Sequence, residues 1–208
     1  MVSISRDAAA APPTDAAHAG PPLVIPDFDI VPRAGVVMAG VIVVALIVVV
    51  ATGGLWPLEF MHVVFGAGWT VIDLLVGLVI GPILGTLSIP TRIEFTTKFM
   101  PKMVVLMPAI VTATLVAGWQ LATHLGTNLS SYPEHGWVVA SMIVVGVMAI
   151  VALGLLEPAN IAVLVELKKP RPNPQVIERL MKRFIYAAGI TGAMQIATFV
   201  IMTKLASS

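Results

Sequence analysis

Long apolar segments separated by short polar connections fill the chain after residue 33. Five of them have roughly the 20 consecutive, mainly apolar residues that a helix needs to cross a bilayer. They cover residues 34–52, 57–84, 103–124, 136–156 and 184–205. The pattern therefore predicts an all-α fold, a polytopic membrane helical bundle of five transmembrane helices in contact with lipid.

The basic residues predict which ends of these helices face the cytoplasm. Of the 12 Lys and Arg residues, only Lys204 lies on one side of the predicted membrane. All others precede the first span, separate the second from the third, or separate the fourth from the fifth. The positive-inside rule then places the N-terminus inside and the C-terminus outside. We expect the membrane to be the cell (plasma or inner) membrane.

Composition agrees with a membrane protein and excludes several kinds of site. The chain is 58% hydrophobic and only 11% charged, with a mean hydropathy of +0.97. Its net charge of +1 argues against nucleic acid as a partner, and the absence of cysteine excludes disulfides, thiolate metal sites and iron–sulfur clusters. A metal or haem would have to be held by His, Met, Tyr or carboxylate side chains.

Two segments outside the spans are predicted to lie in the cytoplasm. Residues 1–33 are rich in Ala and Pro and are predicted to form a disordered tail. Residues 157–183 are predicted to form a basic loop, in which Glu157-Pro158 stops the fourth helix and residues 175–184 form a short amphipathic helix. The basic stretch from Lys168 to Arg183 either binds anionic lipid or docks a cytoplasmic protein partner.

The second span carries two ionisable side chains on one helix face. His62 and Asp73 are separated by about three helical turns, or about 16 Å along the axis. Glycines at 66, 77 and 81 share this face and would let another helix approach it. Lipid cannot solvate a carboxylate, so we expect the face to turn into the bundle.

Three readings of Asp73 remain open: a proton-relay carboxylate with a catalytic role, a partner for a cofactor or substrate cation, and a packing residue. As a packing residue it would bond to a backbone group or to one of three side chains, Thr112, Thr114 or Gln195. Thr191, Gln195 and Thr198 share a face of the fifth span, as Gln120 and His124 do in the third, and both sets are candidates for hydrogen bonds between helices.

Three histidines are predicted to lie at one depth near the outer surface. His62 begins the second span, His124 ends the third and His135 precedes the fourth. Imidazoles from facing helices suit haem or metal ligation. The sequence therefore predicts a haem b or metal site at His62, with His124 as the favoured second ligand and His135 as a further metal ligand.

The stretches LEFMHVVFGAGWTVIDLLVGLVIGPIL and RIEFTTKFMPKMVVLMPAIVTATLVAGWQLA contain a histidine turn, Gly-x-x-Trp and Gly-Pro, then Met-Pro and Ala-Gly-Trp. With these features, residues 58–124 resemble the CopD-like and HemJ-like membrane protein families. The resemblance implies a helical bundle that holds haem b or handles copper. It would make His62 a ligand and would place Trp69 beside the cofactor.

Two functions follow as hypotheses. The first is a membrane redox or electron-transfer component with an outer-leaflet site at His62. The alternative is a non-catalytic membrane subunit or scaffold of a larger complex. A transporter ranks third, because the sequence alone shows no inverted repeat and no paired broken helices.

Overall fold

The protein is described by a computed structural model for residues 25–127 and 129–207, and this part contains helices and no strands. Five of the helices are long and apolar enough to cross a membrane, which confirms the predicted all-α fold with five spans. The elements, several of which run on into one another, are α1 (Arg33–Thr52), α2 (Leu55–Leu74), η2 (Leu75–Ile80), α3 (Gly81–Thr86), α4 (Ile89–His124), α5 (His135–Val151), η3 (Ala152–Leu156), α6 (Glu157–Leu167) and α7 (Pro174–Ala206).

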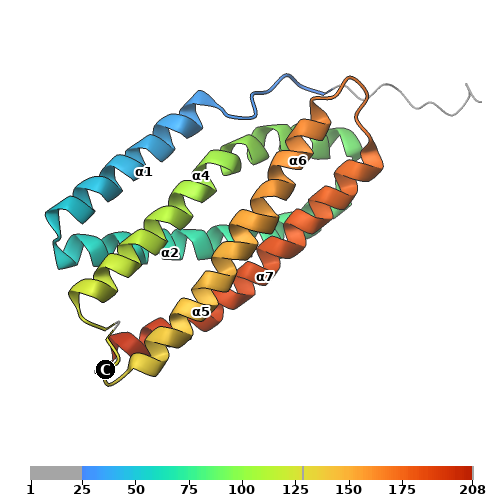
Figure 1. The fold of residues 1–208 in the computed structure, drawn as a ribbon. Coiled ribbons are helices and arrows are strands. Elements are labelled where there is room, and N and C mark those ends of the chain that lie inside the picture. Colours follow the sequence, from blue (N-terminus) through green and yellow to red (C-terminus); the bar gives the residue numbers. More distant parts are fainter. Residues whose placement is uncertain (1–24, 128, 208) are drawn as a thin grey trace, which may run out of the picture.

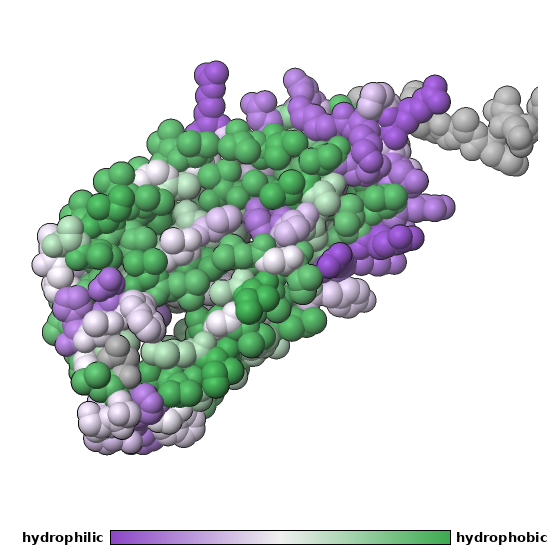
Figure 2. All heavy atoms as spheres, in the orientation of Figure 1, coloured by the Kyte–Doolittle hydropathy of each residue, from purple (hydrophilic) through white to green (hydrophobic). Residues whose placement is uncertain are grey.

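The long helices pack side by side into an elongated bundle (Figure 1). α4 packs against α1 and α2, α7 packs against α2, and α5 and α6 pack against α7. We call the end that carries the α3–α4 and α6–α7 connections the basic end, and the opposite end the distal end. Hydrophobic side chains cover the middle of the face in Figure 2, and hydrophilic ones gather toward its ends, as expected for a multi-pass membrane protein. Which end faces the cytoplasm remains a prediction.

The helices are longer than the predicted spans, and the predicted helix stop at Glu157-Pro158 is wrong. α5, η3 and α6 form one continuous helix of 33 residues through this dipeptide. A proline ring normally clashes with the carbonyl four residues earlier. Here the π-helical segment η3 precedes Pro158, and the Glu157 N–H bonds to the Ala152 carbonyl five residues back. This wider turn accommodates the ring, so the helix continues.

The predicted basic loop is also largely helical. Residues 157–167 belong to α6 and residues 174–183 to α7, so that only 168–173 connect the two helices. α7 begins at Pro174 because the Asn173 side chain caps it, accepting hydrogen bonds from the backbone N–H groups of Gln175 and Val176. The predicted helix at 175–184 is therefore the first part of α7. α4 likewise begins at Ile89 and includes the stretch expected to be a linker.

Two helix hairpins of the same design make up the core of the bundle. In each, the first helix contains a π-helical segment followed at once by Gly81-Pro82 or Glu157-Pro158. Each second helix opens with Pro-x-x-Ile-Glu-x-x-x-Lys, at Pro90 and at Pro174, and in both cases the Glu and Lys form an ion pair. The two hairpins, residues 55–124 and 135–206, are thus two copies of one unit. Both copies run in the same direction through the bundle, and α1 lies outside this repeat.

Residues 25–32, within the predicted disordered tail, lie against the basic end. Ile25, Phe28 and Ile30 pack on the hydrophobic cluster there. The Lys168 ammonium lies 3.4 Å from a carboxylate oxygen of Asp27 and 4.8 Å from the centre of the Phe28 ring. The rest of the predicted tail, residues 1–24, lies outside the described residues.

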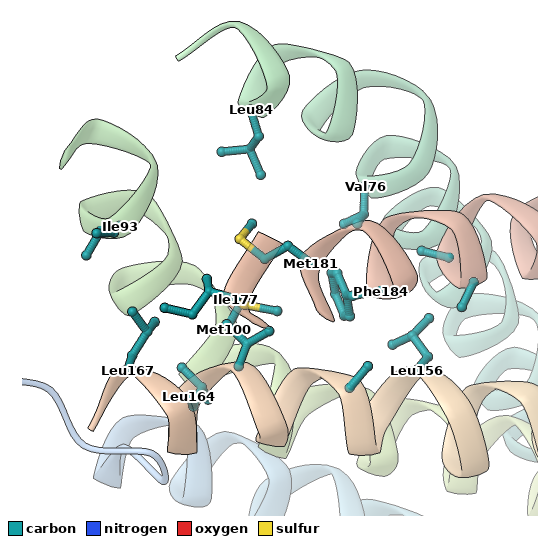
Figure 3. Close-up of a cluster of buried hydrophobic side chains, with 14 residues drawn as sticks. Val76, Leu84, Ile93, Met100, Leu156, Leu164, Leu167, Ile177, Met181 and Phe184 are labelled. Atoms are coloured by element: carbon teal, nitrogen blue, oxygen red, sulfur yellow. The ribbon is translucent and has the colours of Figure 1, made fainter. Parts of the chain in front are cut away.

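The cluster under this segment fills the basic half of the bundle with apolar side chains. Figure 3 shows Met181 and Phe184 of α7 between Val76 and Leu84 on one side and Leu156 and Leu164 on the other. Both hairpins contribute to the cluster, so apolar side chains make their contact at this end.

Candidate functional site

Asp73 is buried in the interior of the bundle, with 2% of its surface exposed. The Thr191 hydroxyl donates a hydrogen bond of 2.8 Å to its Oδ2, and the Gln195 amide donates one of 3.2 Å to the same oxygen. Both donors belong to α7, so Asp73 joins the first hairpin to the second. The predicted inward face is confirmed, and so is Gln195 as a partner of Asp73.

Glycines bring α2 and α7 close enough for these bonds to form. A Cβ atom at Gly77 would lie 2.5 Å from the Cα of Gly189, and one at Gly192 would lie 2.9 Å from the Leu74 side chain. Gly81 similarly faces Ile185. Small residues allow two backbones to approach in this way. Of the three glycines predicted to admit another helix, Gly77 and Gly81 face α7, whereas Gly66 faces Thr114 of α4.

Two more polar atoms beside Asp73 are buried without a hydrogen-bond partner among the described residues. One is the Gln195 Oε1, whose own amide nitrogen reaches Asp73. The other is the Trp69 Nε1, one turn before Asp73 on α2; it interacts with the carboxylate without meeting hydrogen-bond geometry. Trp69 packs among Met107, Ile110 and Met148. The structure therefore places Trp69 beside Asp73, and the predicted contact of Trp69 with a cofactor stays a prediction.

His62 lies between α2 and α4 toward the distal end. Its Nδ1 is 2.9 Å from the Thr114 carbonyl oxygen, and its ring fills the space beside Gly118, where an added Cβ would lie 2.6 Å from it. Thr114 thus pairs with His62 through its backbone, while its hydroxyl bonds to the Ile110 carbonyl. The predicted bonding of Asp73 to Thr114 is not formed.

The other two histidines lie apart from His62. His124 is exposed and bonds through Nδ1 to the Gln120 carbonyl of its own helix. It lies six positions beyond Gly118, about 9 Å along the axis of α4. His135 begins α5, which packs on α7, and its Nδ1 is buried without a partner. Within the described residues, no three His, Cys, Asp or Glu side chains form a group that could hold a metal.

Comparison with known proteins yields no relative for this chain. No family model matches it, and neither a curated protein nor a solved structure matches it. The resemblance to the CopD-like and HemJ-like families therefore stays a prediction, and the functional argument rests on the site itself.

The surroundings of Asp73 suit the binding of a proton. Its neighbours on α7 donate an O–H and an N–H hydrogen bond to it, and such bonds stabilise a carboxylate. Both of these hydrogen bonds reach Oδ2, and neither reaches Oδ1. A proton on Oδ1 would remove the buried charge and leave the bonds to Oδ2 in place.

Proposed function

We propose that this multi-pass membrane protein carries protons across the bilayer through Asp73. The observation on which the proposal depends is the burial of this carboxyl group between the two hairpins, with its two donors on a single oxygen. An ionisable group inside a membrane bundle is costly, and such groups commonly mark proton or ion pathways. Proton movement requires a carboxyl group that exists in both forms, and these contacts suit both.

The position of Asp73 in the fold supports the proposal. It lies near the middle of the 32-residue helix Leu55–Thr86, and its partner Thr191 lies near the middle of α7. Transporters built from internal repeats commonly place their sites near the midplane of the bilayer, between the repeats. They also carry Gly- or Pro-interrupted helices at corresponding positions of the two halves. Gly81-Pro82 and Glu157-Pro158 are such a pair, although the sequence analysis expected none.

Replacing Asp73 by asparagine tests this function. The full-length protein is reconstituted into liposomes, and proton entry driven by an imposed membrane potential is followed with an internal pH dye. Asparagine keeps the shape and can still bond to Thr191, but it cannot take up and release a proton. We expect Asp73→Asn to lower the flux to that of empty liposomes, and the matched change Glu59→Gln, at an exposed carboxylate of α2, to leave it unaltered.

If the protein moves protons only together with another solute, liposomes without that solute show no proton flux. A second measurement therefore detects the protonation of Asp73 directly. Infrared difference spectra of the wild-type protein at two pH values should contain a carboxyl C=O band that Asp73→Asn removes. A folded wild-type protein with neither an Asp73-dependent band nor an Asp73-dependent flux would refute proton carriage. That outcome would favour the non-catalytic subunit, whose mark is a stable complex with another membrane protein.

A haem or metal site at His62 is the second candidate function, and one contact favours it. Histidine ligands usually donate their second ring N–H to a carbonyl or carboxylate, which fixes the ring. The Thr114 carbonyl is placed to accept from Nδ1 of His62, leaving Nε2 as the ligand atom. A haem held there would supply electron transfer. His124 does not fit as its partner in this arrangement, because it lies about two turns beyond the contact of His62 with α4.

Visible spectra of the purified protein test this second candidate. If His62 binds haem b, the oxidised and dithionite-reduced forms will show a Soret band and sharpened α and β bands. The substitution His62→Ala should abolish these bands, whereas His124→Ala should leave them in place, since His124 bonds within its own helix. Pigment that survives His62→Ala would exclude His62 as a ligand.

A further inference from the structure

Two oxygen atoms at the start of α6 are buried and accept no hydrogen bond from the described residues. They are the Oε1 of Glu157 and the Oδ1 of Asn160. Asn160 is completely buried, and its Nδ2 lies 3.4 Å from the Met100 carbonyl oxygen of α4, to which it donates. The same amide group interacts through its N–H side with the Glu157 carboxyl group three positions earlier, without meeting hydrogen-bond geometry, while its oxygen has no donor among the described residues.

Among the described residues, no cation compensates the charge that an ionised Glu157 would carry. Glu157 forms no ion pair with any described residue. On the helices packed against α6, Arg92 is half-buried and donates to the carbonyls of Gly85 and Leu87. The other charged side chains near the basic end of these helices are all exposed: Glu94, Lys98, Lys102, Glu178, Arg179, Lys182 and Arg183. On α6 itself, Glu166 pairs with Lys169.

The backbone before α6 adds a further acceptor to this region. Pro158 has no N–H group, so a carbonyl of the preceding π-helical turn is left without its helical donor. Among the described residues, two side-chain acceptor oxygens of this region thus remain without a hydrogen bond. Buried acceptors of this kind are costly unless a proton, a water or a cation satisfies them.

From these contacts we infer that Glu157 and Asn160 form a second proton site, which exchanges protons with Asp73; the inference rests on the proposed function. A single proton on the Glu157 carboxyl group removes its charge. The Asn160 amide N–H beside it remains available to the carbonyl oxygen of the protonated group. In the exchange, the Glu157 O–H bond breaks and a new O–H bond forms on the Asp73 carboxylate, leaving Glu157 ionised until a proton arrives from the basic end.

The packing places the Glu157 site between Asp73 and the basic end. Leu156, next to Glu157, belongs to the same apolar cluster as Val76, one turn after Asp73, and as Ala188, one turn before Thr191. Both sites therefore border the same apolar cluster, which occupies the interval between them. Apolar side chains fill this interval in Figure 3, where Phe184 lies between Val76 and Leu156. Proton exchange requires water to enter this interval.

Infrared spectroscopy of the full-length protein in lipid nanodiscs tests the site directly. We expect a protonated carboxyl C=O band that persists in Asp73→Asn and disappears in Glu157→Gln. Asn160→Leu should keep this band and shift it to the higher frequency of a carboxyl group that has lost a hydrogen-bond partner. Glu178→Gln is the matched control, because Glu178 is exposed and paired with Lys182. A spectrum that Glu157→Gln leaves unaltered would overturn the inference.

Proton flux in liposomes separates this inference from the proposed function. If both hold, Glu157→Gln slows the Asp73-dependent flux several-fold and Glu157→Asp restores part of it. An Asp73-dependent flux that is unaltered in Glu157→Gln defeats the second site alone. A Glu157 band without any Asp73-dependent flux or band defeats proton carriage, and with it the exchange between the two sites.

Discussion

Gly77→Leu is expected to separate α2 from α7 and to leave little correctly folded protein. The Cα of Gly189 already lies 2.5 Å from where a Cβ atom of residue 77 would stand, and this neighbour is backbone that cannot rotate away. Overpacking against side chains costs about 1–3 kcal/mol. Here the two helices themselves must move apart, which also breaks the bonds of Asp73 to Thr191 and Gln195. We therefore expect a loss of at least about 3 kcal/mol.

The measurement is the fraction of monodisperse protein after detergent extraction, together with its thermal stability. Gly68→Leu is the matched control: the same change on the same helix, at a position where an added Cβ would meet nothing within 4 Å. Equal stability of the two variants would show that α2 and α7 are not in contact as described.

The number of helices was predictable because the bilayer imposes a length and a polarity that are visible locally in the sequence. The lengths of the helices were less predictable. Hydropathy identifies only the apolar part of α4 and misses its amphipathic start at residues 89–102. Pro158 was interpreted as a stop because the π-helical turn that accommodates it has no local sequence signal.

The orientation of Asp73 was predictable, but its partner helix was not. A buried carboxylate and a row of glycines indicate that some helix approaches the face. They do not say which one, and Thr114 on α4 was as good a candidate as Gln195 on α7. Thr191 was recognised as part of a bonding face without being assigned to Asp73. The repeat of Pro-x-x-Ile-Glu-x-x-x-Lys marks α4 and α7 as equivalent second helices, and therefore does not decide between them.

The histidine prediction illustrates a limit of arguments from depth. Placing His62, His124 and His135 at one end of the bundle fixes their height and leaves their positions around the bundle open. His62 faces the α2–α4 contact, His124 folds back on its own helix, and His135 belongs to a helix that packs on α7. Histidines that bind one ligand must be close together in all three dimensions, and only the packing of the helices determines their full positions.

Removing both donors from Asp73 is expected to destabilise the protein more than removing the donors and Asp73 together. In Thr191→Val with Gln195→Leu, the carboxylate stays buried but loses both bonds to Oδ2. Breaking a buried polar pair on one side leaves an uncompensated charge and costs about 3–5 kcal/mol. Adding Asp73→Leu replaces the whole cluster with apolar side chains of similar size, which is often neutral for stability.

Across this series, thermal stability in detergent and proton flux in liposomes should therefore not change together. We expect the double variant to be unstable, and the triple variant to recover most of the lost stability while conducting no more protons than empty liposomes. A triple variant that regains both properties would reduce Asp73 to a packing residue. One that stays unstable would show that the α2–α7 contact needs the polar bonds themselves. Stability regained without flux separates the two roles of Asp73, because apolar packing can replace its contacts but cannot replace a group that binds and releases a proton.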